Sequence, residues 1–235
     1  MISEVAFASD YSSVWRSLTP SMDNFVRRWN MDGYERYWIP LPSLSAPDRR
    51  GLINETAFRL FGMLITAGKQ SVADDPSALD NAFIAAGEYV YGSSQAALSP
   101  LDKVERREVV TLAGRLSGFF SHSLTGVPVR IFPEFEGAGI INKCNGDVAS
   151  ETEIFEIKGG DRNFRSVDYR QVAIYATLHY ATCGKVFDQI SLVNPRRGIV
   201  VRVPTETFTS EVAGKSPVPF FHSLIDIFSG SLVSG

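Results

Sequence analysis

Two acids and a lysine near the middle of the chain have residue types and a spacing suited to chemistry: Asp147, Glu156 and Lys158. The run that ends at Lys158 predicts a β-strand, in which successive side chains point to opposite faces. Glu156 and Lys158 therefore share one face, whereas Phe155 and Ile157 point toward a core. Such a group of charges suits a divalent metal and a phosphate, because carboxylates hold the metal and the ammonium group faces the anion.

The preceding segment brings the two acids together. If residues 141–149 pair with residues 152–158 through a tight turn near Glu151–Thr152, Asp147 lies directly opposite Glu156. Directly opposed residues have Cβ atoms about 4.5–5.5 Å apart, and like charges there are destabilising. Mg²⁺ relieves that conflict, because it prefers oxygen ligands and is held by one or two carboxylates together with a substrate phosphate.

Two features of this site stay open at the level of sequence. The backbone carbonyl of Ile157 is positioned to supply a third oxygen to the metal. Lys158 has two alternative roles. It stays protonated and stabilises charge on the attacked phosphate, or a lowered pKa lets it orient or deprotonate water.

The order of these residues resembles a known family of nucleases. Gly146–Asp147 followed by Glu156–Lys158 is similar to the signature of the PD-(D/E)xK nuclease superfamily, with Gly146 in place of the leading proline. Gln171 and Tyr175 match the Gln-xxx-Tyr element of its RecB-like and lambda-exonuclease-like branch. Residues four apart share one face of a helix. The resemblance covers roughly residues 101–204.

The resemblance implies a fold, a reaction and a set of roles. The fold is an α/β, restriction-endonuclease-like core with a mixed central sheet flanked by helices. The reaction is metal-dependent hydrolysis of DNA phosphodiester bonds with Mg²⁺ or Mn²⁺. Asp147 and Glu156 are the implied metal ligands and Lys158 the implied catalytic lysine, while Gln171 and Tyr175 line the site beside metal, water or DNA phosphate.

Further acids are candidates to complete the metal shell. The family often carries a glutamate on the helix before the sheet, and Glu105 and Glu108 occupy that segment, with Glu108 favoured. Glu134 and Glu136 leave the first predicted strand on one face and are additional candidates. The simpler interpretation is that Glu108 pairs with an arginine and that Glu134 and Glu136 are solvated surface residues.

DNA contacts must come from local groups of arginines. The net charge is −3, without the basic excess common in nonspecific nucleic-acid binders. The group between the lysine and the Gln171 helix is the first candidate, because backbone phosphates would pass there. The predicted DNA-binding residues are Arg162, Arg165 and Arg170, followed by Arg196 and Arg197.

Composition excludes several other classes of protein. Cys144 and Cys183 are the only cysteines and form no Cys-x-x-Cys pair, which argues against an Fe–S cluster or a zinc ribbon. No phosphate-binding loop predicts a nucleotide cofactor. The beginning of the chain does not resemble a signal peptide, and no apolar run approaches about 20 residues. We therefore predict a cytoplasmic protein with no membrane partner.

The chain divides into two parts in this interpretation. Residues 1–97 predict a mostly helical N-terminal subdomain, and residues 98–235 predict the nuclease core. The core elements are expected as a helix over 101–121, three strands up to 158, a helix over 166–182, two strands up to 203 and a helix near 217–229.

The function favoured by the sequence is that of a DNA nuclease in antiphage defence, restriction or repair. The alternative is a catalytically inactive nuclease-fold subunit that binds DNA or serves in assembly. A homodimer and a partner protein of a defence or repair system both stay open, as do endonuclease or exonuclease action and RNA as a substrate.

Overall fold

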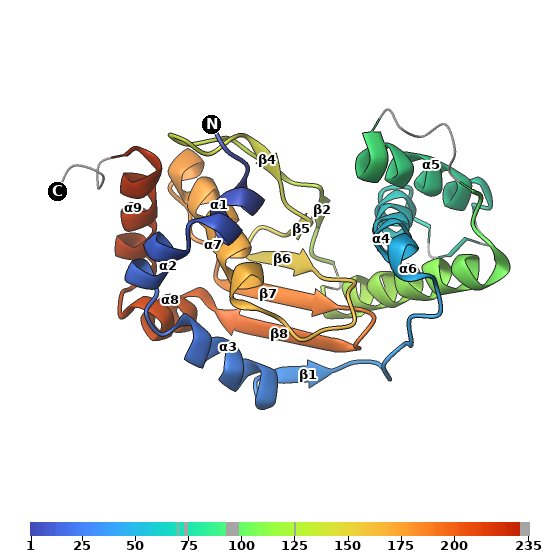
Figure 1. Cartoon of the computed structure of the whole chain (residues 1–235), viewed down its shortest axis with the longest axis horizontal. Coiled ribbons are helices and arrows are strands. Elements are labelled where there is room, and N and C mark those ends of the chain that lie inside the picture. Colours follow the sequence, from blue (N-terminus) through green and yellow to red (C-terminus); the bar gives the residue numbers. More distant parts are fainter. Residues whose placement is uncertain (70, 73–74, 93–98, 125, 231–235) are drawn as a thin grey trace.

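The computed structural model describes residues 1–69, 71–72, 75–92, 99–124 and 126–230, and it shows a mixed β-sheet between two layers of helices (Figure 1). The α/β class with a mixed sheet flanked by helices is confirmed. The helices are α1 (Glu4–Asp10), α2 (Ser12–Leu18), α3 (Met22–Met31), α4 (Arg50–Thr66), α5 (Ser77–Tyr91), α6 (Lys103–Ser123), α7 (Ser166–Cys183), α8 (Thr205–Ala213) and α9 (Pro217–Phe228), with a 3₁₀ turn, η1, over Pro47–Arg49.

The strands form one large sheet and one small ribbon. The bounds are β1 (Tyr34–Arg36), β2 (Arg130–Ile131), β3 (Glu134–Phe135), β4 (Cys144–Asn145), β5 (Val148–Ala149), β6 (Glu153–Ile157), β7 (Gln189–Asn194) and β8 (Ile199–Pro204). The large sheet has the order β1-β8-β7-β6-β5-β2, and β3 pairs with β4 separately. Only β6 and β7 run parallel among the described pairs, because α7 crosses between them.

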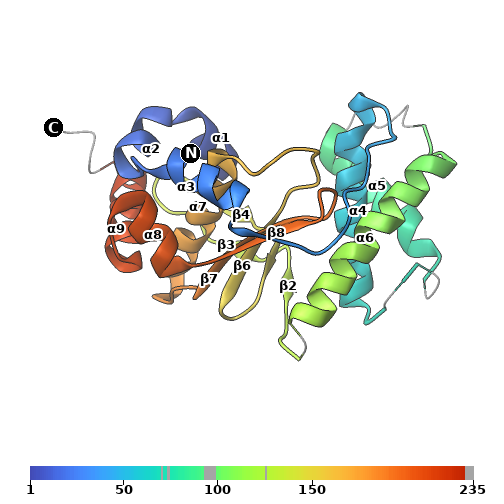
Figure 2. The same ribbon diagram turned by 90° about the horizontal axis from the view of Figure 1, so that it is seen from below.

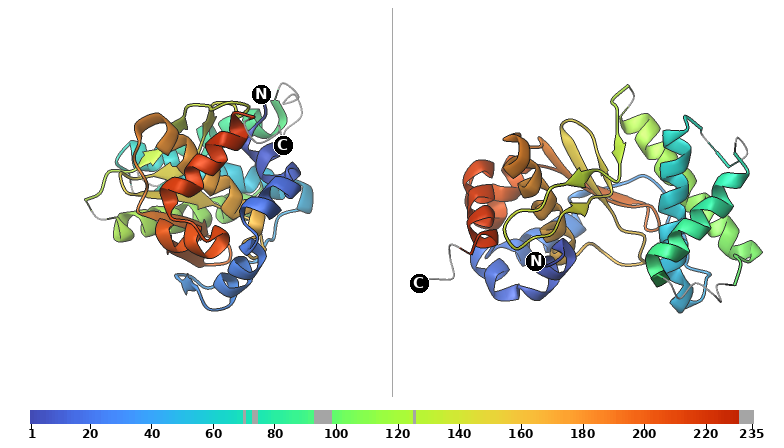
Figure 3. Two further views of the ribbon diagram at one scale, coloured as in Figure 1. Left: turned by 90° about the vertical axis from the view of Figure 1, so that its left-hand side faces the viewer. Right: turned by 90° about the horizontal axis from the view of Figure 1, so that it is seen from above.

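Strand β6 lies inside the sheet and is covered on both faces. Ile154 packs into a cluster with α1–α3 and α7–α9, whereas Phe155 packs into a second cluster with α4–α6. Both side chains are fully buried. The two helical groups therefore stand at opposite ends of the molecule, with the strands between them (Figure 2; Figure 3).

The predicted division at residues 97 and 98 does not match this packing. Phe7, Trp15 and Phe25 from the first helices are buried in the same cluster as α7–α9, and β1 extends the sheet beside β8. Helix α6, which the prediction places in the core part, packs on α4 as well as on the sheet, where Phe120 meets the ring of Phe155 at a centroid distance of 5.0 Å. The reason is that each apolar helix face is buried against the nearest sheet face, whatever its place in the sequence.

Several predicted core elements are observed with small shifts at their ends. Helices α6, α7 and α9 occupy the predicted positions, and β7 and β8 meet at the expected turn near Asn194. Helix α8 was not predicted, and the segment before β6 forms shorter strands than expected. Among the described residues, no helix combines the length and apolar character needed to cross a membrane.

Candidate active site

The hairpin between β5 and β6 has the register predicted from sequence. Val148 pairs with Phe155 and Ala149 with Ile154, so one further step places Asp147 opposite Glu156. The turn is closed by the N–H of Ser150, which donates to the carbonyl of Glu153 at 2.8 Å.

The two acids have different local partners. Asp147 is half-buried, and its Oδ2 accepts a hydrogen bond from the Ile157 N–H at 2.6 Å. Glu156 is 2 % exposed, and its Oε1 accepts from the Lys158 ammonium at 2.5 Å. The second oxygen of Glu156, Oε2, is buried and has no hydrogen-bond partner among the described residues.

A chain of hydrogen bonds runs from this pair along helix α7. Lys158 Nζ also donates to Gln171 Oε1 at 3.0 Å, and Gln171 Nε2 donates to the Tyr175 hydroxyl at 2.8 Å. Tyr175 is buried and donates to Glu4 Oε1 at 3.4 Å. The structure thus brings the four predicted residues from Glu156 to Tyr175 together, and it adds Glu4 of α1.

Burial and neighbouring charge set the protonation of the group. Burial, and then the charge of Glu156, raise the pKa of Asp147 well above its usual value. Burial also raises the pKa of Glu156, against the opposing effect of Lys158. For Lys158, burial lowers the pKa, but the charges of Glu156 and Asp147 outweigh it and the net pKa is raised. The lysine therefore keeps its proton, which favours charge stabilisation over action as a base.

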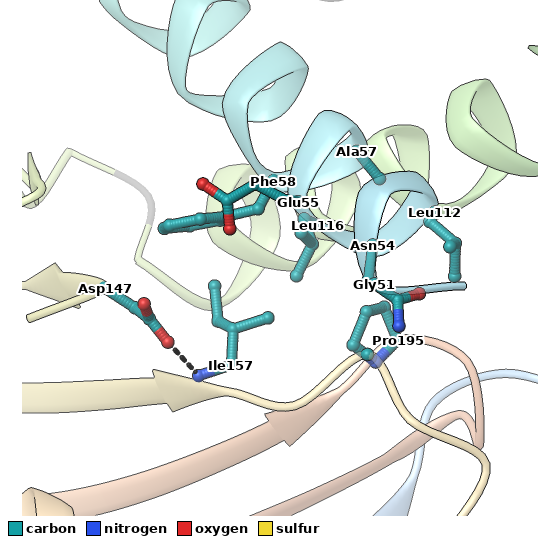
Figure 4. Close-up of a pocket in the computed structure, with 11 residues that line it drawn as sticks. Gly51, Asn54, Glu55, Ala57, Phe58, Leu112, Leu116, Asp147, Ile157 and Pro195 are labelled. Atoms are coloured by element: carbon teal, nitrogen blue, oxygen red, sulfur yellow. Dashed lines mark hydrogen bonds between the residues drawn. The ribbon is translucent and has the colours of Figure 1, made fainter. Parts of the chain in front are cut away.

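Asp147 borders a pocket of about 140 Å³ between the sheet and helix α4 (Figure 4), whereas Glu156 is not among the residues that line it. In Figure 4 Glu55 and Asp147 lie on opposite sides of this pocket. Helix α4 comes this close because Gly159 has no side chain: a Cβ there would lie 2.6 Å from the Asn54 Cγ. The residues that line the pocket are Gly51, Asn54, Glu55, Ala57, Phe58, Leu112, Leu116, Asp147, Ile157, Gly159 and Pro195.

Glu55 is a site residue that the sequence interpretation missed. Burial raises its pKa, and Arg59 Nε donates to its Oε1 at 2.7 Å. Its charge also contributes to the raised pKa of Asp147. The only signal for Glu55 in the sequence is an acid within the apolar run of α4. The family pattern points to the helix directly before the sheet, and the prediction therefore favours Glu108.

The prediction that Glu108 holds the metal is wrong in this structure. Its Oε1 pairs with Arg196 Nη1 at 2.5 Å, with side chains 3 % and 1 % exposed, and its Oε2 accepts from the Ser45 N–H at 3.2 Å. Arg196 also donates to the Gly159 carbonyl at 2.8 Å, so the prediction that Arg196 contacts DNA is wrong as well. Glu105 is bound by Arg49 at 2.7 Å.

The remaining predicted acids lie on the surface. Glu134 and Glu136 are exposed and form ion pairs with Lys143 at 2.6 and 3.3 Å. Neither borders the pocket beside Asp147.

The predicted DNA-binding arginines differ in what they contact. Arg162 forms a bidentate ion pair with Asp168 at 2.6 and 2.8 Å and stays 32 % exposed. Arg170 is partly buried, because it donates to the Ala8 carbonyl at 3.3 Å and lies over the Trp15 ring.

Two further arginines of the predicted set remain. Arg197 is half-buried, with a buried Nε that lacks a partner among the described residues. Arg165 is exposed at the start of α7, which makes it the predicted arginine best placed to meet a phosphate.

The donor set fits a divalent cation in chemistry. The charge of Glu156 raises the pKa of Asp147, burial raises the pKa of Glu156, and Glu156 Oε2 lacks a partner among the described residues, so an oxygen-binding cation would relieve these conditions. Within the described part of the chain, no cluster of three or more His, Cys, Asp or Glu side chains is close enough to form a metal centre. The acids on the protein thus make at most a partial shell, which suits a metal completed by water and substrate oxygens.

Comparison with protein-family models finds no match, and comparison with curated proteins finds no significant match. The functional argument therefore depends on the geometry of the site.

Proposed function

We propose that the protein is a metal-dependent deoxyribonuclease whose active site is the group of Asp147, Glu156, Lys158, Gln171 and Tyr175. Asp147 and Glu156 would hold Mg²⁺ or Mn²⁺, with the Ile157 carbonyl as a further oxygen. When bound, the metal polarises the scissile phosphate and activates water.

The observation that carries the proposal is the position of Lys158. Its ammonium group is held between Glu156 Oε1 at 2.5 Å and Gln171 Oε1 at 3.0 Å, next to the strand that carries Asp147. A lysine with a raised pKa in this place stabilises negative charge that develops on the attacked phosphate.

Helix α7 acts as the support for that lysine. Gln171 accepts a hydrogen bond from Lys158 and donates one to Tyr175, so the amide is fixed in one orientation. Because Tyr175 is buried, this chain anchors the lysine to the packed interior instead of leaving it free to rotate.

Glu55 adds a third acid on the opposite side of the pocket. It is the residue of α4 that we propose approaches the metal or its water ligands in place of Glu108. Its ion pair with Arg59 would then loosen as the carboxylate turns toward the cation.

The test is an incubation with linear, circular and single-stranded DNA in Mg²⁺, Mn²⁺ or EDTA, with an RNA strand as a parallel substrate. The expected result is metal-dependent cleavage of DNA that Lys158→Ala abolishes and Lys143→Ala leaves unchanged. DNA binding without cleavage under every metal condition would support the inactive-subunit alternative instead.

The biological setting is proposed at the level of chemistry only. A nuclease that acts on DNA fits antiphage defence, restriction or repair, alone, as a homodimer or with a partner protein. Cys144 and Cys183 are both free thiols, in agreement with a cytoplasmic location.

A further inference from the structure

A second pocket of about 330 Å³ continues from the candidate active site. Glu55, Phe58 and Asp147 belong to the lining of both pockets, so the second one opens directly beside Asp147, one of the proposed metal ligands. The residues that line it are Glu55, Phe58, Arg59, Tyr89, Phe132, Asn145, Gly146 and Asp147.

One wall of this pocket is built from aromatic rings around an arginine. The Arg59 guanidinium lies 5.1 Å from the centre of the Tyr89 ring and 5.3 Å from that of Phe132. Tyr89 is 72 % exposed and Phe132 is 36 % exposed, so both rings are open to a ligand. Phe58 contacts the Phe132 ring edge-on at a centroid distance of 4.9 Å.

The backbone that carries Phe132 adopts a costly conformation. Its φ is 53°, and it is the one residue other than glycine with positive φ among those the structure describes. The conformation is held because its N–H donates to the Asp147 carbonyl at 3.0 Å and its carbonyl accepts from Asn145 Nδ2 at 3.0 Å. Strain of this kind persists where the surroundings over-determine it, and it is common at ligand sites.

We propose that this second pocket holds one unpaired nucleotide next to the scissile phosphate, with its base stacked on the exposed rings of Tyr89 and Phe132. The inference rests on the proposed nuclease function and adds the substrate class to it. Exposed aromatic rings beside a cation are the means by which proteins hold single-stranded nucleic acid, because every base has a stacking face.

The size of the pocket supports a single nucleotide. Its volume of about 330 Å³ lies at the lower end of the range of about 300–1,000 Å³ for small-molecule sites. A base inside a duplex stays stacked between its neighbours and cannot enter without unpairing. The preferred substrate is therefore DNA with unpaired nucleotides, such as a single strand, an overhang or a frayed end.

The experiment places the fluorescent base 2-aminopurine at successive positions of a DNA single strand, with Lys158→Ala protein in Mg²⁺ so that the strand stays whole. Stacking on a ring quenches this fluorophore, so we expect quenching at one defined position. Adding Tyr89→Ala should remove that quenching and weaken strand binding about tenfold, whereas Tyr89→Phe should preserve both. Tyr91→Ala is the matched control, because it removes another exposed tyrosine of α5 that does not line the pocket.

Cleavage rates in proteins that keep Lys158 separate this inference from the proposed function. Faster cutting of single strands and overhangs than of closed duplex, with Tyr89→Ala slowing only the first two, supports the pocket. Normal Mg²⁺-dependent cleavage with equal rates in Tyr89→Ala, Tyr89→Phe and Tyr91→Ala overturns the pocket and leaves the nuclease standing. An absence of both binding and cleavage by the unaltered chain overturns both.

Discussion

Two glutamates on strand β6, three residues apart, show how a structural acid differs from a candidate catalytic one. Glu153 is 4 % exposed and Glu156 is 2 % exposed. Both oxygens of Glu153 are used: Oε1 accepts from Ser191 at 2.5 Å and Arg202 at 2.9 Å, and Oε2 accepts from Arg202 at 2.5 Å. Among the residues that the structure describes, Glu156 has one hydrogen-bond partner, Lys158, and its buried second oxygen has none.

The difference shows where the chain retains unsatisfied binding capacity. The acid of Glu153 is fully matched by a bidentate arginine and a hydroxyl, so it gains nothing from a further ligand. Glu156 faces a second carboxylate and an ammonium group, and the three charges do not satisfy one another. Groups of charges that do not satisfy one another lower stability, and functional sites commonly contain them.

The largest effect is expected at the buried ion pair of Glu108 and Arg196, in which a carboxylate faces a guanidinium as Glu153 faces Arg202. Arg196→Ala should lower the free energy of unfolding by about 3–5 kcal/mol, because it leaves a buried glutamate without its cation. Chemical denaturation measures this, with exposed Arg165→Ala as the control. A loss below 1 kcal/mol would mean that the pair is not buried as described.

Lys158→Ala should reduce the rate of cleavage much more than it reduces stability. Cleavage should fall by about 10²–10³-fold, because the removed ammonium group stabilises charge only in the transition state. The melting temperature should fall less than in Arg196→Ala, because burial already raises the pKa of Glu156 and the carboxyl can take up a proton once its cation is removed. Single-turnover kinetics and thermal unfolding on the same sample check both. The control is Lys143→Ala, whose ion pairs are on the surface.

Asp147→Asn and Glu153→Gln should change stability in opposite directions. In EDTA at pH 7, Asp147→Asn should stabilise the fold by about 1 kcal/mol, because it removes a charge held in a buried site beside Glu156. Glu153→Gln should destabilise it by about 1–3 kcal/mol, because Arg202 loses its partner. Two changes of the same sign would remove the distinction between the fully paired acid Glu153 and the acids of the candidate site.

The pH dependence of the first variant has a defined sign. The folded pKa of Asp147 is raised above the unfolded value of about 3.9, so the folded state binds its proton more tightly. Asp147 therefore contributes stability at low pH and loses it as the pH rises from about 4 toward the raised pKa. The advantage of Asp147→Asn should shrink at pH 4, and Mg²⁺ should stabilise only the unaltered protein.

The smallest effect concerns the arginines at the start of α7. Arg165→Ala should lower the slope of log affinity for DNA against log salt concentration by about 1, because one phosphate contact is lost. Arg170→Ala should leave that slope unchanged, because its side chain packs on Trp15 and Ala8. A salt titration by fluorescence anisotropy measures both, and equal slopes in the two variants would contradict the assignment.

Local periodicity predicted the parts of the site that are close in sequence. The opposition of Asp147 and Glu156 follows from a short hairpin, and the shared face of Gln171 and Tyr175 follows from one helical turn. Both depend on geometry within about ten residues, which the strand and helix periods fix.

The other features of the site and the fold depend on packing between segments that are distant in the chain, which a single sequence does not show. Glu55 reaches the site only because α4 packs closely at Gly159, and Arg196 is buried because its partner lies on the distant helix α6. Two adjacent arginines such as Arg196 and Arg197 are expected on the solvated surface unless a buried acid is known to pair with them. For the same reason, the sequence does not show that α1–α3 pack with α7–α9 on the sheet instead of forming a separate helical subdomain.

A crystal soaked in Mn²⁺ tests the central claim most directly. The account predicts an anomalous peak between the carboxylates of Asp147 and Glu156, beside the Lys158 ammonium, and no such peak in crystals of Asp147→Asn. The claim is contradicted if these carboxylates bind no ion at a Mn²⁺ concentration that supports cleavage, or if the only peak lies at the surface pair of Glu134 and Glu136.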